Sequence, residues 1–171
     1  MSAGTLESLV ERLAAALEAR GQMLATAESC TGGGIAAACT DRAGSSAWFE
    51  RGFVTYSNAA KVELLAVSGE AIDRHGAVSQ AVVLAMAEGA LRRSRADWSV
   101  AVTGVAGPSG GSAEKPVGTV WIAVGQRLQD SVRASAALHC FAGHRREVRE
   151  ASVVESLRML MLSVESAPVD G

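Results

Sequence analysis

The apolar positions along the chain change spacing several times, and each spacing predicts a different element. Leu and Val side chains at residues 6, 9, 10, 13 and 17 share one helical face, and Gly21 follows at the expected helix end. Residues 22–27 form a mostly apolar run of strand length. A helix is then predicted over residues 31–41. This range includes the glycines at its start, and alanine and isoleucine predominate after them.

The remainder of the chain continues this alternation. A strand is expected at residues 52–56, followed by a short helix that is capped by Ser57 or Asn58 and carries Lys61. One or two helical turns at residues 70–75 precede a helix from Ser79 to about residue 91 with one apolar face. The last elements expected are strands at residues 98–102, 117–124 and 131–141, a helix at 145–164, and a loose tail at 167–171.

Helices interleaved with strands predict an α/β fold, namely a three-layer α/β/α sandwich around a mixed β-sheet. The 171 residues suffice for one domain with a sizeable core, so residues 1–171 are interpreted as a single domain. Hydrophobic residues make up 49% of the chain and charged residues 20%, which argues against a disordered chain.

The charge distribution argues against nucleic acid as a partner. The net charge is −2, and phosphate neutralisation requires clustered Lys and Arg. Arg145, Arg146 and Arg149 form one of the denser basic clusters, which we interpret as a solvated face of the last helix.

The cysteines and histidines do not have the spacing of metal ligands, so no metal site is expected. Reduced thiols in the cytoplasm are the simplest interpretation of Cys30, Cys39 and Cys140. Residues 1–7 show no signal-peptide pattern, and no apolar run is long enough to span a bilayer, so no membrane association is expected.

Residues 27–34 predict a strand, a glycine-rich turn and a helix in direct succession. Such a junction directs backbone N–H groups at one spot, which suits an anion or a developing oxyanion. Ser29, Cys30 and Thr31 place two hydroxyls and a thiol at that spot. The alternative is a purely structural turn, with Thr31 or Ser29 as the N-cap of the helix.

A serine nucleophile requires a base, and no histidine lies in a suggestive motif. Lys61 is a candidate base, because its apolar neighbours allow the desolvation that lowers a lysine pKa. Tyr56, the only tyrosine, is a candidate to pass on a proton or to hold the lysine. Taken separately, Lys61 also fits a solvated helix lysine, and Tyr56 a half-buried strand residue.

A second glycine-rich loop, at residues 103–111, follows the strand expected at 98–102. Its glycines allow backbone amides to approach a ligand closely. The loop has neither the P-loop nor the dinucleotide-binding pattern, and it also fits an irregular surface connection.

Together these segments resemble the CinA C-terminal domain family, the nicotinamide-nucleotide amidases. The resemblance covers nearly the whole chain. The matching stretches, in order, are residues 27–33 (AESCTGG), 49–58 (FERGFVTYSN) with Lys61, 75–79 (HGAVS), 103–108 (TGVAGP) and 115–121 (KPVGTVW).

The resemblance implies an α/β/α domain that hydrolyses the amide of nicotinamide mononucleotide to give nicotinate mononucleotide and ammonia, with no cofactor. It implies Ser29 as the nucleophile, Lys61 as the base and Tyr56 as an assisting hydroxyl, and it leaves the roles of Ser29 and Thr31 incompletely separated. The residues that it implies for substrate binding are Thr31, Gly32, Gly33, Thr103, Gly104 and Arg145. The expected partner is a small nucleotide, with a homodimer as a possibility. The competing interpretation is a non-catalytic module that binds a nucleotide or phosphate.

Overall fold

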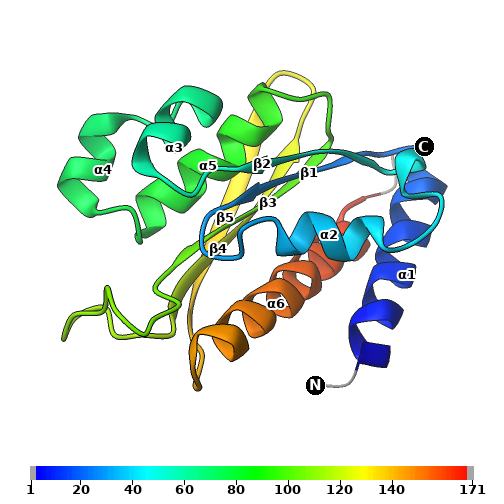
Figure 1. Ribbon diagram of the computed structural model, residues 1–171. Coiled ribbons are helices and arrows are strands. Elements are labelled where there is room, and N and C mark those ends of the chain that lie inside the picture. The colour runs from blue at the N-terminus through cyan, green and yellow to red at the C-terminus, as the bar shows by residue number, and fades with distance from the viewer. Residues whose placement is uncertain (1–2, 169–171) are drawn as a thin grey trace.

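The computed structural model describes residues 3–168 and has a five-stranded sheet at its centre (Figure 1). The strand order is β2-β1-β3-β4-β5; β1 is parallel to both β2 and β3, while β4 and β5 are antiparallel to their neighbours. The strands are β1 (Leu24–Glu28), β2 (Phe49–Val54), β3 (Trp98–Gly104), β4 (Thr119–Arg127) and β5 (Val132–Cys140).

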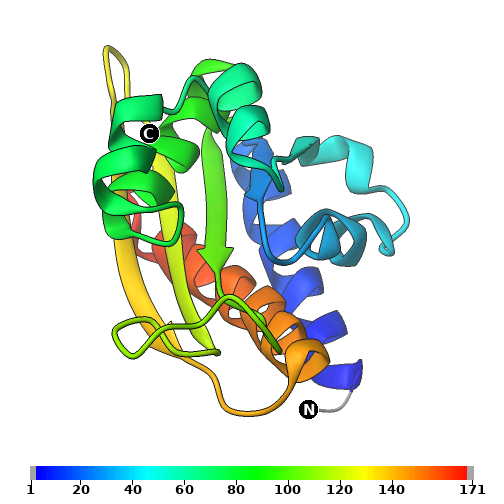
Figure 2. The same cartoon turned by 60° about the vertical axis from the view of Figure 1, so that its left-hand side comes forward.

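Helices cover both faces of this sheet, which completes three layers (Figures 1 and 2). One face carries α1 (Ala3–Arg20), α2 (Gly34–Thr40) and α6 (Arg145–Ser166). The other carries α3 (Asn58–Leu65), α4 (Gly69–His75) and α5 (Gln80–Arg92), and a 3₁₀ turn (Ser45–Ala47) precedes β2. The expected α/β/α sandwich with a mixed sheet is therefore confirmed.

The order of the strands creates a switch point at the carboxyl end of β1. The chain leaves β1 through α2 on one face to reach β2, and it returns through α3–α5 on the other face to reach β3. In open α/β sheets, ligands bind in the crevice that such a reversal opens beyond the strand ends. The topology alone therefore predicts a ligand site at the residues that follow Glu28.

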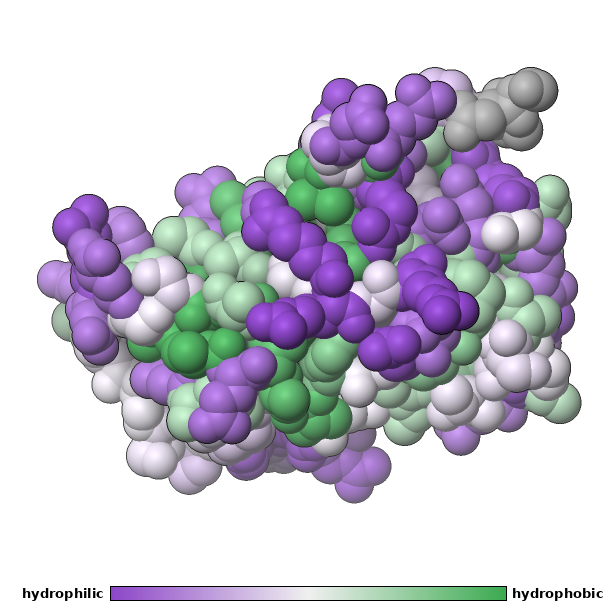
Figure 3. All heavy atoms as spheres, turned by 90° about the horizontal axis from the view of Figure 1, so that it is seen from above, coloured by the Kyte–Doolittle hydropathy of each residue, from purple (hydrophilic) through white to green (hydrophobic). Residues whose placement is uncertain are grey.

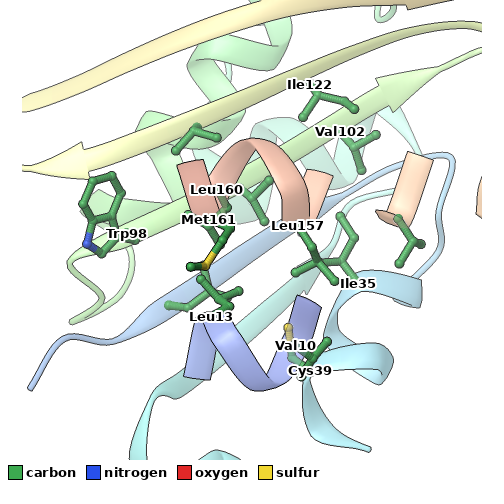
Figure 4. Close-up of a cluster of buried hydrophobic side chains, with 14 of the residues drawn as sticks. Val10, Leu13, Ile35, Cys39, Trp98, Val102, Ile122, Leu157, Leu160 and Met161 are labelled. Carbon is green, nitrogen blue, oxygen red and sulfur yellow. The ribbon is translucent and has the colours of Figure 1, made fainter. Parts of the chain in front are cut away.

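The larger of two hydrophobic clusters lies between the sheet and α1, α2 and α6. Figure 4 shows Leu13 of α1, Ile35 of α2 and Leu157 of α6 converging with side chains from β3 and β4. Leu13, Ile35 and Leu157 are fully buried, and burying a side chain of this size contributes roughly 1.5–3 kcal/mol. This cluster fixes α6 against the segment that joins β1 to α2.

The second cluster packs α5 against the opposite face of the sheet. Met86 and Leu91 of α5 are buried there with Ala101 of β3. Gly89 allows α3 to approach closely, since a Cβ at this position would overlap the carbonyl of Leu65. The close contact holds α3, and with it Lys61, near the end of β1.

Most of the expected elements are present, with shifted boundaries. The strand expected at residues 52–56 is β2, which begins and ends earlier, and the carbonyls of Thr55 and Tyr56 beyond its end accept hydrogen bonds from Lys61. The helix expected from Thr31 begins only at Gly34. In the expected tail, Arg20 bonds the carbonyls of Ala167 and Pro168, and residues 169–171 lie outside the described residues.

The described helices include none with the length and apolarity needed to cross a membrane. Seen from above the view of Figure 1, hydrophilic side chains separate patches of hydrophobic ones (Figure 3). Val62 and Leu64 of α3 are among the larger apolar side chains that are exposed.

Candidate active site

The segment after β1 forms a tight turn that presents Ser29 at the switch point. Gly32 and Gly33 adopt positive φ angles of 61° and 97°, which side chains with a Cβ rarely allow. The Ser29 N–H donates to the carbonyl of Val102 on β3, and the Gly32 N–H donates back to the carbonyl of Ser29. Two glycines and two backbone hydrogen bonds thus fix the position of the serine.

Lys61 of α3 reaches Ser29 inside the protein. Its Nζ lies 3.0 Å from the Ser29 Oγ, and it donates to the carbonyls of Thr55 at 2.9 Å and Tyr56 at 3.2 Å. Lys61 is 1% exposed and Ser29 is 8% exposed. The structure therefore brings together the two residues expected to act as nucleophile and base, although they are 32 positions apart in the sequence.

Burial determines which form of these groups is favoured. It lowers the pKa of Lys61 below its usual value of 10.5, because the ammonium form loses hydration. The same effect raises the pKa of the Cys30 thiol to about 11, so at neutral pH this side chain is a thiol rather than a nucleophilic thiolate. A neutral amine beside a serine hydroxyl is the combination that proton abstraction requires.

Glu28, the last residue of β1, accepts four hydrogen bonds from the turn and the start of α2. Its fully buried carboxylate accepts hydrogen bonds from the Thr31 hydroxyl at 2.7 Å and from the N–H groups of Gly33, Ile35 and Ala36 at 2.8–3.1 Å. A carboxylate thus fills the anion-binding N-terminus of α2.

This arrangement corrects the structural alternative in which Thr31 or Ser29 caps the helix. The N-cap is Gly33, which has no side chain that could accept a hydrogen bond. The Glu28 carboxylate instead accepts hydrogen bonds from the N–H groups of Ile35 and Ala36 in the first turn of α2. Thr31 and Gly33 are both expected to contact substrate, and in this structure the Thr31 hydroxyl and the Gly33 N–H have Glu28 as their partner.

Arg149 of α6 holds the same turn from the opposite side of the sheet to Lys61. Its Nε donates to the carbonyl of Cys30 at 3.1 Å, and its Nη2 donates to that of Thr31 at 2.9 Å. The interpretation of the basic cluster as a solvated helix face is wrong for Arg149, since its guanidinium bonds these carbonyls. It fits Arg146, which is exposed and pairs with Glu150 at 2.6 Å.

Arg145 joins two loops at the rim of the site. Its Nη1 donates to the carbonyl of Gly107 at 2.8 Å, and its Nη2 donates to the Tyr56 hydroxyl at 3.1 Å. The Tyr56 side chain is 59% exposed, and Lys61 bonds only the backbone carbonyl of this residue. Figure 2 shows the loop before β4 beside the start of α6, where Arg145 lies.

Thr103 and Gly104 end β3, next to the turn that carries Ser29. The Thr103 hydroxyl donates to the carbonyl of Ala77 at 2.9 Å, and Lys115 in the following loop donates to the carbonyl of His75 at 3.1 Å. A Cβ at Gly104 would lie only 2.7 Å from a methyl carbon of Val120. This loop is therefore tied to the α4–α5 corner, and it follows the strand whose Val102 carbonyl accepts a hydrogen bond from the Ser29 N–H.

A groove of about 730 Å³ lies behind the turn, between α2 and α6, and Thr31, Gly34, Arg149 and Val153 are among its lining residues.

Within residues 3–168, no three His, Cys, Asp or Glu side chains lie close enough together to hold a metal ion. The site is thus built from a serine, a lysine, an arginine at the rim and oriented backbone groups.

Sequence reasoning missed Glu28 and Arg149. Both act on backbone atoms, and no periodicity or motif spacing reveals such contacts. For Glu28, an acidic residue at the end of a buried strand and directly before a glycine-rich turn was a usable signal. For Arg149, the pattern of α6 alone gave no signal.

The fold and site define a class of protein: a three-layer α/β domain with a buried serine–lysine pair under a glycine-rich turn at the switch point of its sheet. The chain belongs to the CinA C-terminal domain family, which it matches over residues 6–164.

Named relatives agree with this assignment over almost the whole chain. The chain is 50% identical over 160 residues to the nicotinamide-nucleotide amidohydrolase PncC of Escherichia coli K12, covering 94% of this chain and 95% of that protein. It is 54% identical over 158 residues to the enzyme of the same name from Enterobacter agglomerans, covering 92% and 94% of the two chains. The crystal structure of the competence/damage inducible protein CihA from Agrobacterium tumefaciens superposes with a TM-score of 0.90 at 46% identity, covering 97% of this chain and all of that one.

Proposed function

We propose that this protein is an amidohydrolase that converts nicotinamide mononucleotide and water to nicotinate mononucleotide and ammonia, with Ser29 as nucleophile and Lys61 as base. The observation that carries the proposal is the buried contact of 3.0 Å between the Lys61 Nζ and the Ser29 Oγ. Its substrate is inferred from similarity, over nearly the full chain, to proteins named nicotinamide-nucleotide amidohydrolase.

The three hydrogen-bond partners of Lys61 account for its role as a base. A neutral amine has two N–H donors and one lone pair. Carbonyl oxygens only accept, so the carbonyls of Thr55 and Tyr56 use both donors of the amine. The lone pair is then directed at the third partner, the Ser29 hydroxyl, which donates its proton to Lys61.

The reaction follows in two stages. Lys61 takes the Ser29 proton while the Oγ attacks the carboxamide carbon, which forms a tetrahedral intermediate. The Lys61 ammonium then protonates the departing nitrogen, and ammonia leaves a nicotinoyl ester on Ser29. A water molecule attacks this ester with Lys61 again as base, which releases the carboxylate and restores the serine.

Negative charge on the carboxamide oxygen needs a hydrogen-bond donor close to Ser29. The N–H groups of Cys30 and Thr31 belong to the turn that carries Ser29, and neither has an acceptor among residues 3–168. We assign the Thr31 N–H to the oxyanion, because its peptide is the one whose carbonyl bonds Arg149. Gly32 and Gly33 provide the turn itself, and Thr103 with Gly104 ends the neighbouring strand β3.

The substrate phosphate requires a separate cationic site. The N-terminus of α2 is filled by Glu28, whose carboxylate would repel a phosphate. Arg145 lies at the rim and uses two of its five N–H donors on Tyr56 and Gly107. We therefore assign phosphate binding to Arg145.

The test is to incubate purified protein with nicotinamide mononucleotide and to quantify ammonia and the pyridine products by chromatography. We expect ammonia and nicotinate mononucleotide in equal amounts. Binding of the nucleotide without turnover would instead identify a nucleotide-binding module. Release of free nicotinamide would show cleavage of the glycosidic bond and would contradict the amidohydrolase assignment.

A further inference from the structure

We propose that Arg149 is a positioning residue that orients the Cys30–Thr31 peptide so that the Thr31 N–H faces the reacting oxygen. This inference rests on the proposed function of the site. It concerns a residue of α6 that contacts neither Ser29 Oγ nor Lys61 through any hydrogen bond in the described part of the chain.

The guanidinium of Arg149 is committed to the backbone of the turn. It bonds the carbonyls of Cys30 and Thr31, and within residues 3–168 it forms no ion pair with a carboxylate. On the same helix, Arg146 and Arg158 pair with Glu150 and Glu155. The planar, positively charged guanidinium of Arg149 therefore donates hydrogen bonds to two consecutive carbonyl groups.

Peptide planarity converts this contact into a direction for the Thr31 N–H. In a trans peptide the C=O and N–H groups point in opposite directions. Because the Cys30 carbonyl points toward Arg149 on the α6 side, the Thr31 N–H of the same peptide points toward the opposite side. Lys61 approaches Ser29 from that opposite side, since α3 and α6 cover different faces of the sheet (Figure 1).

The next peptide group is fixed in the same manner and provides an internal check. The Thr31 carbonyl bonds Arg149, and the Gly32 N–H of that peptide turns away to bond the Ser29 carbonyl at 3.1 Å. The N–H groups of Cys30 and Thr31 are the two in the turn without an acceptor in the described residues, and of these only the Thr31 N–H belongs to a peptide whose carbonyl bonds Arg149. Glu28 fixes the far end of the turn through Gly33, so Arg149 and Glu28 hold it from two sides.

Arg149 also strengthens the donor that it orients. A cation on the carbonyl oxygen polarises the peptide group, which makes its N–H a better hydrogen-bond donor. The benefit appears when negative charge develops on the substrate oxygen, so it favours the transition state over bound substrate. Loss of Arg149 should therefore lower kcat and leave KM nearly unchanged.

The experiment compares Arg149→Ala, Arg149→Lys and Arg146→Ala with the parent protein, using ammonia release from nicotinamide mononucleotide and thermal melting. We expect kcat to fall about 10- to 100-fold in Arg149→Ala with KM within about threefold of the parent. Arg149→Lys should also lose kcat, because an ammonium lacks the planar fork that bonds two carbonyls. Arg146→Ala, which loses only a surface ion pair, should match the parent.

Guanidinium chloride at low, non-denaturing concentration adds a readout that a packing defect would not produce. The groove between α2 and α6 is lined by Arg149 and gives the ion a route to the vacated position. We expect it to restore part of the kcat of Arg149→Ala, while equal potassium chloride does not.

Parental kcat in Arg149→Ala or in Arg149→Lys would overturn the role, and so would a raised KM at unchanged kcat. A loss of kcat that matches a loss of folded protein, or one that guanidinium leaves unchanged, would assign Arg149 to packing instead. A parent protein that releases no ammonia would refute the proposed function rather than the role of Arg149 alone.

Discussion

The role proposed for Lys61 depends directly on the burial of its side chain. A lysine with 1% exposure loses the hydration of its ammonium form, and α3 supplies no carboxylate hydrogen-bonded to it to compensate. Its described partners are two carbonyls and the Ser29 hydroxyl. Burial lowers the pKa of Lys61 and so shifts the equilibrium toward the neutral amine, which is the form that accepts a proton.

The first prediction concerns the pH dependence of this group. The pKa of Lys61 is lowered in the folded protein, so its amine becomes neutral as the pH rises through a value below 10.5. We expect kcat/KM for nicotinamide mononucleotide to rise over the same pH range and then to level off. Lys61→Arg should lose at least about 100-fold in kcat/KM, since arginine stays protonated.

Lys115→Arg is the matched control, because Lys115 is the only other lysine and its bond to the carbonyl of His75 suits either side chain. It should keep the parental profile. Substantial activity in Lys61→Arg, or a rate that falls as the pH rises from neutral, would contradict the general-base role.

Individual residues were predictable from the sequence to the extent that their partners were side chains with recognisable chemistry. Ser29 and Lys61 carry a hydroxyl and an amine, groups that suit a nucleophile and a base, and each lies in a distinctive segment. Glu28 and Arg149 act on N–H and C=O groups that every residue possesses. The position of Glu28 directly before the glycines was a usable signal, but the contacts themselves depend on the path of the backbone through the turn.

At the scale of elements, α2 shows how one buried carboxylate can satisfy the N-terminus of a seven-residue helix. Glu28 bonds the N–H groups of Gly33, Ile35 and Ala36 and lies at the positive end of the helix. The helix begins three residues later than expected, because the preceding residues form the turn above this carboxylate. Its start was not predictable, since Glu28 precedes the helix by six positions.

The second prediction is that Glu28→Ala lowers the free energy of unfolding by about 3 kcal/mol or more, measured by urea denaturation. The change leaves several buried donors without an acceptor, and each such group costs roughly 1–3 kcal/mol. Glu150→Ala on α6 is the control, since that carboxylate is exposed and only pairs with Arg146. Equal stability of Glu28→Ala and the parent protein would show that the turn and helix do not depend on this carboxylate.

The whole molecule brings the site together from distant segments. Ser29 follows β1, Lys61 lies on α3, Gly107 precedes β4 and Arg145 begins α6. The alternation of helices and strands predicted the layers correctly, because periodicity is a local property. The strand order, and with it the switch point beside Ser29, depends on long-range pairing that periodicity does not specify.

The third prediction tests whether this assembly recognises phosphate through Arg145. Nicotinamide mononucleotide should have a kcat/KM about 10- to 100-fold above that of nicotinamide riboside, as expected for one charge-assisted contact. Arg145→Ala should reduce this ratio toward one. The variant also loses the bonds to Tyr56 and Gly107, but those losses affect both substrates and cancel in the ratio.

Tyr56→Phe serves as the control, since it removes the hydroxyl partner of Arg145 and keeps the guanidinium. The substrate ratio should remain at the parental value. An unchanged ratio in Arg145→Ala would remove this arginine from the phosphate site, and equal efficiency of the two substrates in the parent would exclude phosphate recognition.

The central claim, a serine nucleophile activated by a buried lysine, is tested most directly by ammonia release from nicotinamide mononucleotide in Ser29→Ala. Ser156→Ala is the matched control, because Ser156 is also a buried serine and its hydroxyl has no partner in the described part of the chain. We predict that Ser29→Ala retains the parental melting temperature within a few degrees and loses activity by about four orders of magnitude or more, while Ser156→Ala remains active. A folded Ser29→Ala protein with near-parental ammonia release would contradict the account.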